Sequence, residues 1–175
     1  MKNPFRKTYS SSEQEIFRFL GQNSLFERLT PDEMSEFVPF MHLREYQQNE
    51  AVFFRNDPSA ALYLIKEGRV KLSIDIDERM EDLTVIEAGD AFGDNAMLKD
   101  TKRIYNAIVS TESATMYVIP NVNLREIFSD EPKIRGKMME ALAMQYNKYT
   151  ENLFLGYKNS FGFFNLGSAY DPKRR

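Results

Sequence analysis

Between residues 42 and 119, short apolar runs alternate with turn-forming residues, and this pattern constrains the fold more than any other feature of the chain. The runs are too short for typical helices and recur at nearly regular spacing, which predicts an antiparallel β-sandwich or β-roll. Asn49 and Asn56 stand in two of the turns, where asparagine tolerates positive φ. The charged stretch 75–82 is predicted to be an exposed hairpin loop. The predicted strands cover residues 42–46, 51–54, 62–65, 70–76, 83–86, 104–111 and 115–119.

Helical patterns precede this β-rich region. One helix is predicted to begin at residue 12, and a second begins after Thr30. Thr30 is the expected N-cap, Pro31 occupies the first helical position, and Glu33 closes a capping box. Pro39 is predicted to end or kink this second helix because proline lacks the N–H that a helix needs.

The chain becomes helical again after the last predicted strand. A short helix is predicted over residues 122–128, and a long one from Pro132 to about Leu155. The long helix carries an apolar stripe that we interpret first as a packing surface. The stripe consists of Ile134, Met138, Leu142, Tyr149 and Leu153. The aromatic and glycine-rich residues 156–175 have two interpretations: a segment folded back over the barrel, or an adhesive strip for a partner protein.

The stretch 87–107 combines a glycine, an acid and an arginine around one predicted helical turn. Gly93 precedes the turn that includes Asn95 and Ala96, so several backbone N–H groups should be unpaired and convergent. Such a nest binds an anion, most often a phosphate, and Arg103 can add two charge-assisted hydrogen bonds. Asp94 would repel phosphate, so we expect it to accept a hydrogen bond from a hydroxyl. Recognition of phosphate and hydroxyl in one small cradle indicates a nucleotide.

These residues also form a family motif. The run Phe92-Gly93-Asp94-Asn95-Ala96-Met97-Leu98, followed by Arg103 and Ala107-Ile108-Val109, resembles the phosphate-binding cassette of cyclic nucleotide-binding domains. The run Leu62-Tyr63-Leu64-Ile65-Lys66-Glu67-Gly68-Arg69-Val70 resembles the Tyr-x-Ile-x-x-Gly-x-Val strand pair of the same family. The resemblance covers roughly residues 25–153.

The resemblance implies a mainly β fold: an eight-stranded antiparallel, jelly-roll-like β-roll with N-terminal helices and a long C-terminal helix. It implies a catabolite-activator-like sensor domain with cAMP or cGMP as the possible ligand, and a C-terminal helix that often pairs in a dimer. The candidate ligand-binding residues are Gly93, Asp94, Asn95, Ala96, Arg103, Tyr105 and Asn106.

Two cassette positions depart from the family pattern. The acid is usually glutamate, whereas Asp94 is one methylene shorter, about 1.5 Å of reach. The family usually shows Arg-x-Ala before the next strand. Alignment on Ala107 puts Tyr105 in the place of the arginine, whereas alignment on loop length puts Arg103 in register and Tyr105 in the place of the small residue. In either case, the expected pocket is altered.

Composition excludes several function classes. The net charge is −3, with 23 basic and 26 acidic residues, so the chain has no electrostatic footprint for nucleic acid. No apolar run approaches the ~20 residues that span a bilayer, so no membrane is expected. The absence of cysteine fits a cytoplasmic protein. His42 is the only histidine and no nucleophile–base motif is recognisable, so we expect no enzyme, no metal site and no cofactor.

We expect three segments: a flexible arm over residues 1–10, a cyclic nucleotide-binding-like domain over 11–155, and the tail over 156–175. The tail is too short and too rich in glycine for a helix-turn-helix domain. Two functions stay open. The first is a stand-alone ligand sensor that signals to an unknown protein partner through its C-terminal helix. The second is a protein–protein interaction module whose degenerate pocket no longer binds a cyclic nucleotide because Tyr105 fills the phosphate space.

Overall fold

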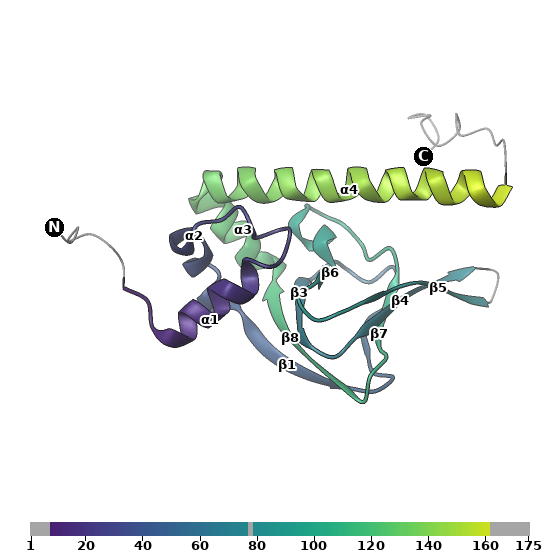
Figure 1. Ribbon diagram of the computed structural model, residues 1–175, viewed down its shortest axis with the longest axis horizontal. Coiled ribbons are helices and arrows are strands. Elements are labelled where there is room, and N and C mark those ends of the chain that lie inside the picture. The colour runs from purple at the N-terminus through teal and green to yellow at the C-terminus, as the bar shows by residue number, and fades with distance from the viewer. Residues whose placement is uncertain (1–7, 77–78, 162–175) are drawn as a thin grey trace. The chain divides into compact units, whose positions relative to one another are not determined.

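The computed structural model describes residues 8–76 and 79–161, which form two four-stranded antiparallel sheets with helices before and after them (Figure 1). The first sheet has the order β1 (His42–Gln47), β8 (Ser113–Pro120), β3 (Ala61–Glu67) and β6 (Ala91–Phe92). The second has the order β2 (Ala51–Phe53), β7 (Asn106–Val109), β4 (Val70–Ile76) and β5 (Arg79–Ile86). The eight strands of the described residues and the flanking helices confirm the predicted fold class.

The helices before the sheets begin at capping boxes. Helix α1 (Ser11–Leu20) is capped by Ser10, one residue before the predicted start at residue 12 would require. Helix α2 (Pro31–Ser35) is capped by Thr30 with Glu33 as its reciprocal partner, as the sequence predicted. Helix α2 ends before Pro39, and a separate 3₁₀ turn, η1 (Val38–Phe40), contains that proline. The proline therefore breaks the predicted helix into two short pieces.

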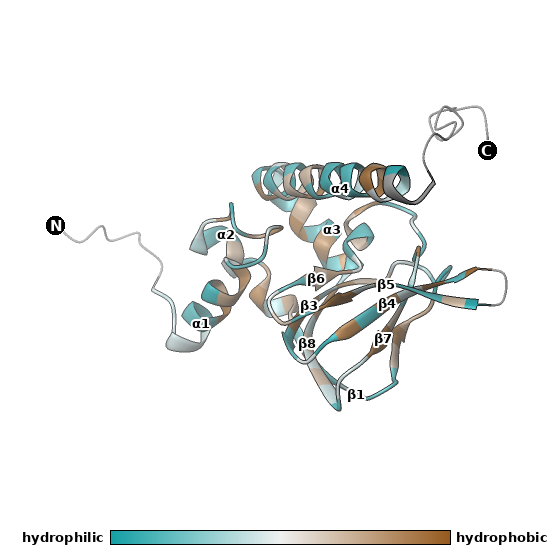
Figure 2. Cartoon of the chain, turned by 45° about the vertical axis from the view of Figure 1, so that its right-hand side comes forward, coloured by the Kyte–Doolittle hydropathy of each residue, from teal (hydrophilic) through white to brown (hydrophobic). Residues whose placement is uncertain are grey.

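Both sheets contribute side chains to one hydrophobic core. Three of its aromatic residues come from different strands: Phe53 from β2, Tyr63 from β3 and Phe92 from β6. The Tyr63 and Phe92 rings stack at 5.1 Å between centroids, and Phe53 lies 5.7 Å from Tyr63. Figure 2 shows hydrophobic residues on strands of both sheets. We call these three rings the aromatic floor.

Some strand boundaries differ from the prediction. The predicted hairpin loop over residues 75–82 is mostly paired, because β4 extends to Ile76 and β5 begins at Arg79. Strand β7 is shorter than predicted. The backbone at Arg103 pairs instead with the turn after β2, where Asn56 N–H donates to Arg103 O and Arg103 N–H donates to Asp57 O. Asn49 and Asn56 adopt positive φ, of 64° and 71°, as their turn positions predicted.

After the sheets, α3 (Asn121–Asp130) precedes the long helix α4 (Pro132–Phe161). The chain divides into two compact units, residues 1–139 and 140–175. In the first unit Met138 is buried, and Lys137 Nζ forms an ion pair of 2.6 Å with Glu33 of α2. In the second unit Tyr149 and Leu153 of the predicted stripe are exposed.

Helix α4 alternates between hydrophilic and hydrophobic residues along its length (Figure 2). None of the helices in the described ranges is both long enough and apolar enough to cross a membrane. The predicted tail over residues 156–175 begins inside α4, which continues to Phe161 instead of ending near Leu155. The rest of the tail, residues 162–175, lies outside the described residues, and so do most of the contacts that its two interpretations concern.

Candidate functional site

The candidate site is built around the turn that follows β6. Gly93 adopts φ +70°, a left-handed conformation that glycine enters without strain, and it opens the 3₁₀ turn η2 (Asp94–Met97). A Cβ at Gly93 would lie 2.5 Å from Arg103 Nη1, so close contact with this arginine also requires glycine. All four residues of η2 are buried. The sequence therefore placed a tight glycine-led turn here correctly.

The backbone N–H groups of this turn bond to acceptors within the chain. Gly93 N–H donates to Tyr105 Oη at 3.0 Å, and Ala96 N–H donates to Gly93 O at 3.0 Å. Asn95 N–H donates to Asp94 Oδ1, also at 3.0 Å. The prediction that these N–H groups are unpaired is therefore wrong for this structure, because an internal oxygen accepts from each of the three.

Arg103 lies inside the protein, with only 2% of its surface exposed. Its Nη2 donates to Ala61 O at 2.6 Å, and its Nη1 donates to Gly93 O at 2.9 Å and to Asn95 Oδ1 at 3.1 Å. The guanidinium carbon lies 4.1 Å from the centroid of the Phe53 ring, a cation–π contact. Its Nε is buried and has no hydrogen-bond partner among the described residues. Arg103 therefore connects β3 to the turn, and its Nε donor is unused among the described residues.

The side chain of Asn95 joins the turn to its surroundings. Its Oδ1 accepts from Ser59 Oγ at 2.7 Å as well as from Arg103, and its Nδ2 donates to Lys102 O at 2.7 Å. Thr101 Oγ1 donates to Asn95 O at 2.7 Å. Asn95 therefore holds both ends of the loop over residues 95–102, and the amide is a structural member of the site.

Burial has the largest influence on the pKa values of Asp94 and Arg103, the two charged residues of the cluster. Burial raises the pKa of Asp94, although hydrogen bonds from backbone N–H groups and the positive charge of Arg103 partly oppose this rise. Burial lowers the pKa of Arg103, whereas the nearby Tyr63, Tyr105 and Asp94 favour its charged form. Each charge thus partly compensates the cost of burying the other, but burial outweighs this compensation and disfavours both charged forms.

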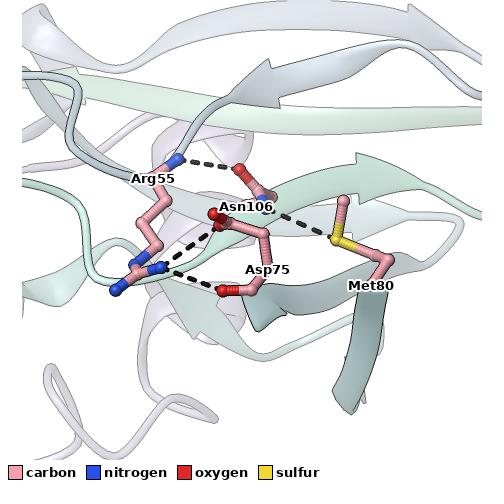
Figure 3. A network of polar contacts seen from close by, with 4 residues as sticks. All are labelled: Arg55, Asp75, Met80 and Asn106. Carbon is pink, nitrogen blue, oxygen red and sulfur yellow. Dashed lines mark hydrogen bonds and ion pairs between the residues drawn. The ribbon is translucent and has the colours of Figure 1, made fainter. Parts of the chain in front are cut away.

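Asn106 belongs to a different network. Its Oδ1 accepts from Arg55 N–H at 2.8 Å and its Nδ2 donates to Met80 Sδ at 3.6 Å, while Arg55 Nη1 bonds to Asp75 (Figure 3). Successive residues of a strand point to opposite faces, and Ala107, the next residue of β7, belongs to the core. The structure therefore brings six of the seven candidate residues together and leaves Asn106 apart from them.

Sequence reasoning missed three partners of the cluster: Phe53, Ser59 and Ala61. Phe53 was expected only as a strand residue, and Ala61 acts through its backbone carbonyl, which no side-chain pattern reveals. Ser59 follows Pro58 in a turn, and its hydroxyl carried no signal beyond that turn. Among the described residues, no group of three or more His, Cys, Asp or Glu side chains converges as metal ligands.

Comparison with known proteins shows which family the sequence matches. The model of the "Cyclic nucleotide-binding domain" family matches residues 43–131, about half of the chain. A protein named as a potassium channel protein, from Rhodopseudomonas palustris, is 30% identical over 115 residues, which are 65% of this chain and 27% of that protein. The chain thus spans about a quarter of the length of this relative.

Two solved structures share the fold. The regulatory domain of Toxoplasma gondii PKA, solved with cAMP, has a TM-score of 0.62 at 20% identity and is matched over 69% of this chain and 46% of that chain. The sensor domain of the transcriptional regulator DNR from Pseudomonas aeruginosa has a TM-score of 0.67 at 19% identity, over 81% of this chain and 95% of that chain.

Proposed function

The chain belongs to the cyclic nucleotide-binding domain family, and from this premise we propose that it is a regulatory domain that binds cAMP or cGMP and catalyses no reaction. The observation that carries the proposal is the buried polar cluster, in which Gly93, Asp94, Asn95, Ala96, Arg103 and Tyr105 meet beside the aromatic floor. The T. gondii regulatory domain of similar fold holds cAMP, which supports this choice of ligand.

Ligand binding requires the cluster to exchange internal bonds for bonds to the nucleotide. A phosphate oxygen carries charge, so its hydrogen bonds from N–H donors are stronger than those of the neutral oxygens that it replaces. A hydrogen bond from the buried Nε of Arg103 to the ligand stabilises the complex most, because this donor has no partner among the described residues. The ligand-competent arrangement is then a minor state that the ligand selects, and its low population weakens the apparent affinity.

A route from the cluster to the helices supports a regulatory role. Ser59 Oγ donates to Asn95 Oδ1 at 2.7 Å, and the carbonyl of Ser59 accepts from Asn121 Nδ2 at 2.8 Å. Asn121 is the first residue of α3, so three side chains join the turn η2 to the start of that helix. A shift of η2 on ligand binding therefore moves α3, and an unknown cytoplasmic partner, or a second copy of the chain, reads the change through α4.

The second candidate is a protein–protein interaction module whose degenerate pocket no longer binds a cyclic nucleotide. The internal bonds of Gly93 N–H and of both terminal nitrogens of Arg103 favour it, because a working anion site usually leaves such donors for the ligand. Under this alternative the cluster stabilises the loop only.

Calorimetric titration of the full chain with cAMP, cGMP and 5′-AMP distinguishes the two candidates. The proposal predicts saturable binding of at least one cyclic nucleotide and weaker binding of 5′-AMP. Asn106→Ala is a matched control, because Asn106 lies outside the cluster and its loss should leave the affinity unchanged. If neither cAMP nor cGMP binds at millimolar concentration, the ligand-sensor function is rejected in favour of the interaction module.

A further inference from the structure

Tyr105 occupies a position that links the aromatic floor to the candidate anion site. It lies between Arg103 and β7, its ring packs against the core cluster, and its centroid is 5.8 Å from that of Phe53. From this anchored ring, the hydroxyl oxygen accepts a hydrogen bond of 3.0 Å from Gly93 N–H. The core thus fixes the ring, and the ring holds an oxygen atom on the first amide of the cassette.

The position of this oxygen is the one that an oxygen of a bound ligand would need. Gly93 adopts the left-handed conformation and its carbonyl accepts from Arg103 Nη1 at 2.9 Å, so the direction of its N–H is set by the fold. One N–H group makes one good hydrogen bond, and Tyr105 Oη and a ligand oxygen therefore exclude each other at this donor. A phenol is neutral, so an anionic oxygen displaces it at a net gain, whereas a neutral hydroxyl or water gains little.

We propose that the Tyr105 hydroxyl is an internal competitor for the ligand: it closes the cassette in the free domain and leaves Gly93 N–H when an anionic ligand oxygen arrives. This inference rests on the proposed function and specifies its regulation. It makes Tyr105 a residue that sets the affinity threshold and favours charged over neutral ligands. Arg103 plays no part in the exchange at Gly93 N–H, because it bonds to the carbonyl of Gly93 on the other side of the residue.

The test removes the hydroxyl alone. Tyr105→Phe keeps the ring in the core and deletes the acceptor, so cAMP or cGMP no longer displaces it. We expect the affinity of the full chain for the bound cyclic nucleotide to rise by about 2- to 10-fold, the equivalent of one neutral hydrogen bond. Tyr46→Phe is the matched control, because Tyr46 packs against the same core cluster, and among the described residues none of the cassette hydrogen bonds given above involves it.

A second readout needs no ligand. In amide hydrogen exchange and ¹⁵N-correlated NMR spectra of the free chain, Tyr105→Phe should shift the Gly93 N–H resonance and speed its exchange, whereas Tyr46→Phe should leave both unchanged. An unchanged Gly93 amide in Tyr105→Phe would refute the contact and with it the inference. A changed amide with equal or weaker nucleotide affinity would refute competition but leave the proposed function intact. Failure of both proteins to bind cAMP and cGMP would reject the proposed function, and the competitor with it.

Discussion

The substitution Arg103→Met tests whether the guanidinium is a structural clamp. Methionine keeps much of the apolar stem but removes every donor. Gly93 O keeps the N–H of Ala96 and Asn95 Oδ1 keeps the hydroxyl of Ser59, so neither acceptor is left without a donor. Ala61 O loses its bond of 2.6 Å to Arg103, and an unsatisfied buried acceptor costs about 1–3 kcal/mol.

Loss of the cation–π contact with Phe53, at 4.1 Å, adds roughly 1–2 kcal/mol in a site this well desolvated. The free energy of unfolding should therefore fall by about 2–5 kcal/mol, a range that the removal of the burial cost of Arg103 can only reduce. At this chain length, such a loss lowers the melting temperature by several degrees or more.

Urea denaturation followed by circular dichroism measures this change. Arg55→Met is the matched control: Arg55 pairs with Asp75 at 3.3 Å but is about one-third exposed, so its loss should cost less than about 1 kcal/mol. If Arg103→Met lost less than about 1 kcal/mol while cyclic nucleotide affinity fell more than tenfold, the guanidinium would be a ligand-facing group, and the clamp described here would be wrong.

Three further predictions concern the site and the long helix. Burial raises the pKa of Asp94, so ionisation of its carboxyl group lowers the stability of the fold as the pH rises from the unfolded-state pKa to the folded-state pKa. Asp94→Asn should therefore melt at a higher temperature than wild type at pH 7 in scanning calorimetry. A difference in melting temperature that fails to shrink as the pH falls toward about 4 would contradict this. Gly93→Ala should lose more than the roughly 1–2 kcal/mol of left-handed strain, because its Cβ would meet Arg103, whereas Gly89→Ala has open space and should lose only the strain; equal losses in denaturation would refute the clash. The exposed Tyr149 and Leu153 of α4 should support self-association, so their joint replacement by glutamate should convert a dimer into a folded monomer in sedimentation, and a monomeric wild type at micromolar concentration would end this idea.

The apolar stripe on α4 was readable from sequence, but its members are not equivalent. Met138 is fully buried, so a charged substitution there would damage the fold and report nothing about association. A stripe of helical period shows which residues share a face, and only tertiary structure shows which part of that face is already covered.

Local chemistry made much of the fold predictable. Thr30 and Glu33 form the capping box that their spacing required, and Asn49 and Asn56 take the positive φ that their turns demanded. These features depend on residues within one or two turns of chain. The two-residue strand β6 was missed because Ala91–Phe92 is too short for any alternation, and it exists through pairing with β3.

The sequence predicted which residues gather around the turn, with the exception of Asn106, but it did not predict how they bond to one another. Gly93, Asp94 and Arg103 were selected as groups that face a ligand, and the structure shows them bonded to one another and to the chain around them. Arg103 reaches Ala61, which lies 42 residues earlier in the sequence. Contacts of that range depend on how the sheets pack, so sequence spacing identified the cluster and left its internal bonding undetermined.

We propose that a cyclic nucleotide binds at the buried cluster and displaces internal bonds there. The most direct measurement is an ¹⁵N-correlated NMR titration of the full chain with cAMP and with cGMP. We expect saturable shifts centred on the amides of Gly93, Asn95 and Ala96, with smaller shifts at Asn121 at the start of α3. Spectra that stay unchanged at millimolar nucleotide, or shifts confined to residues outside this cluster, would contradict it.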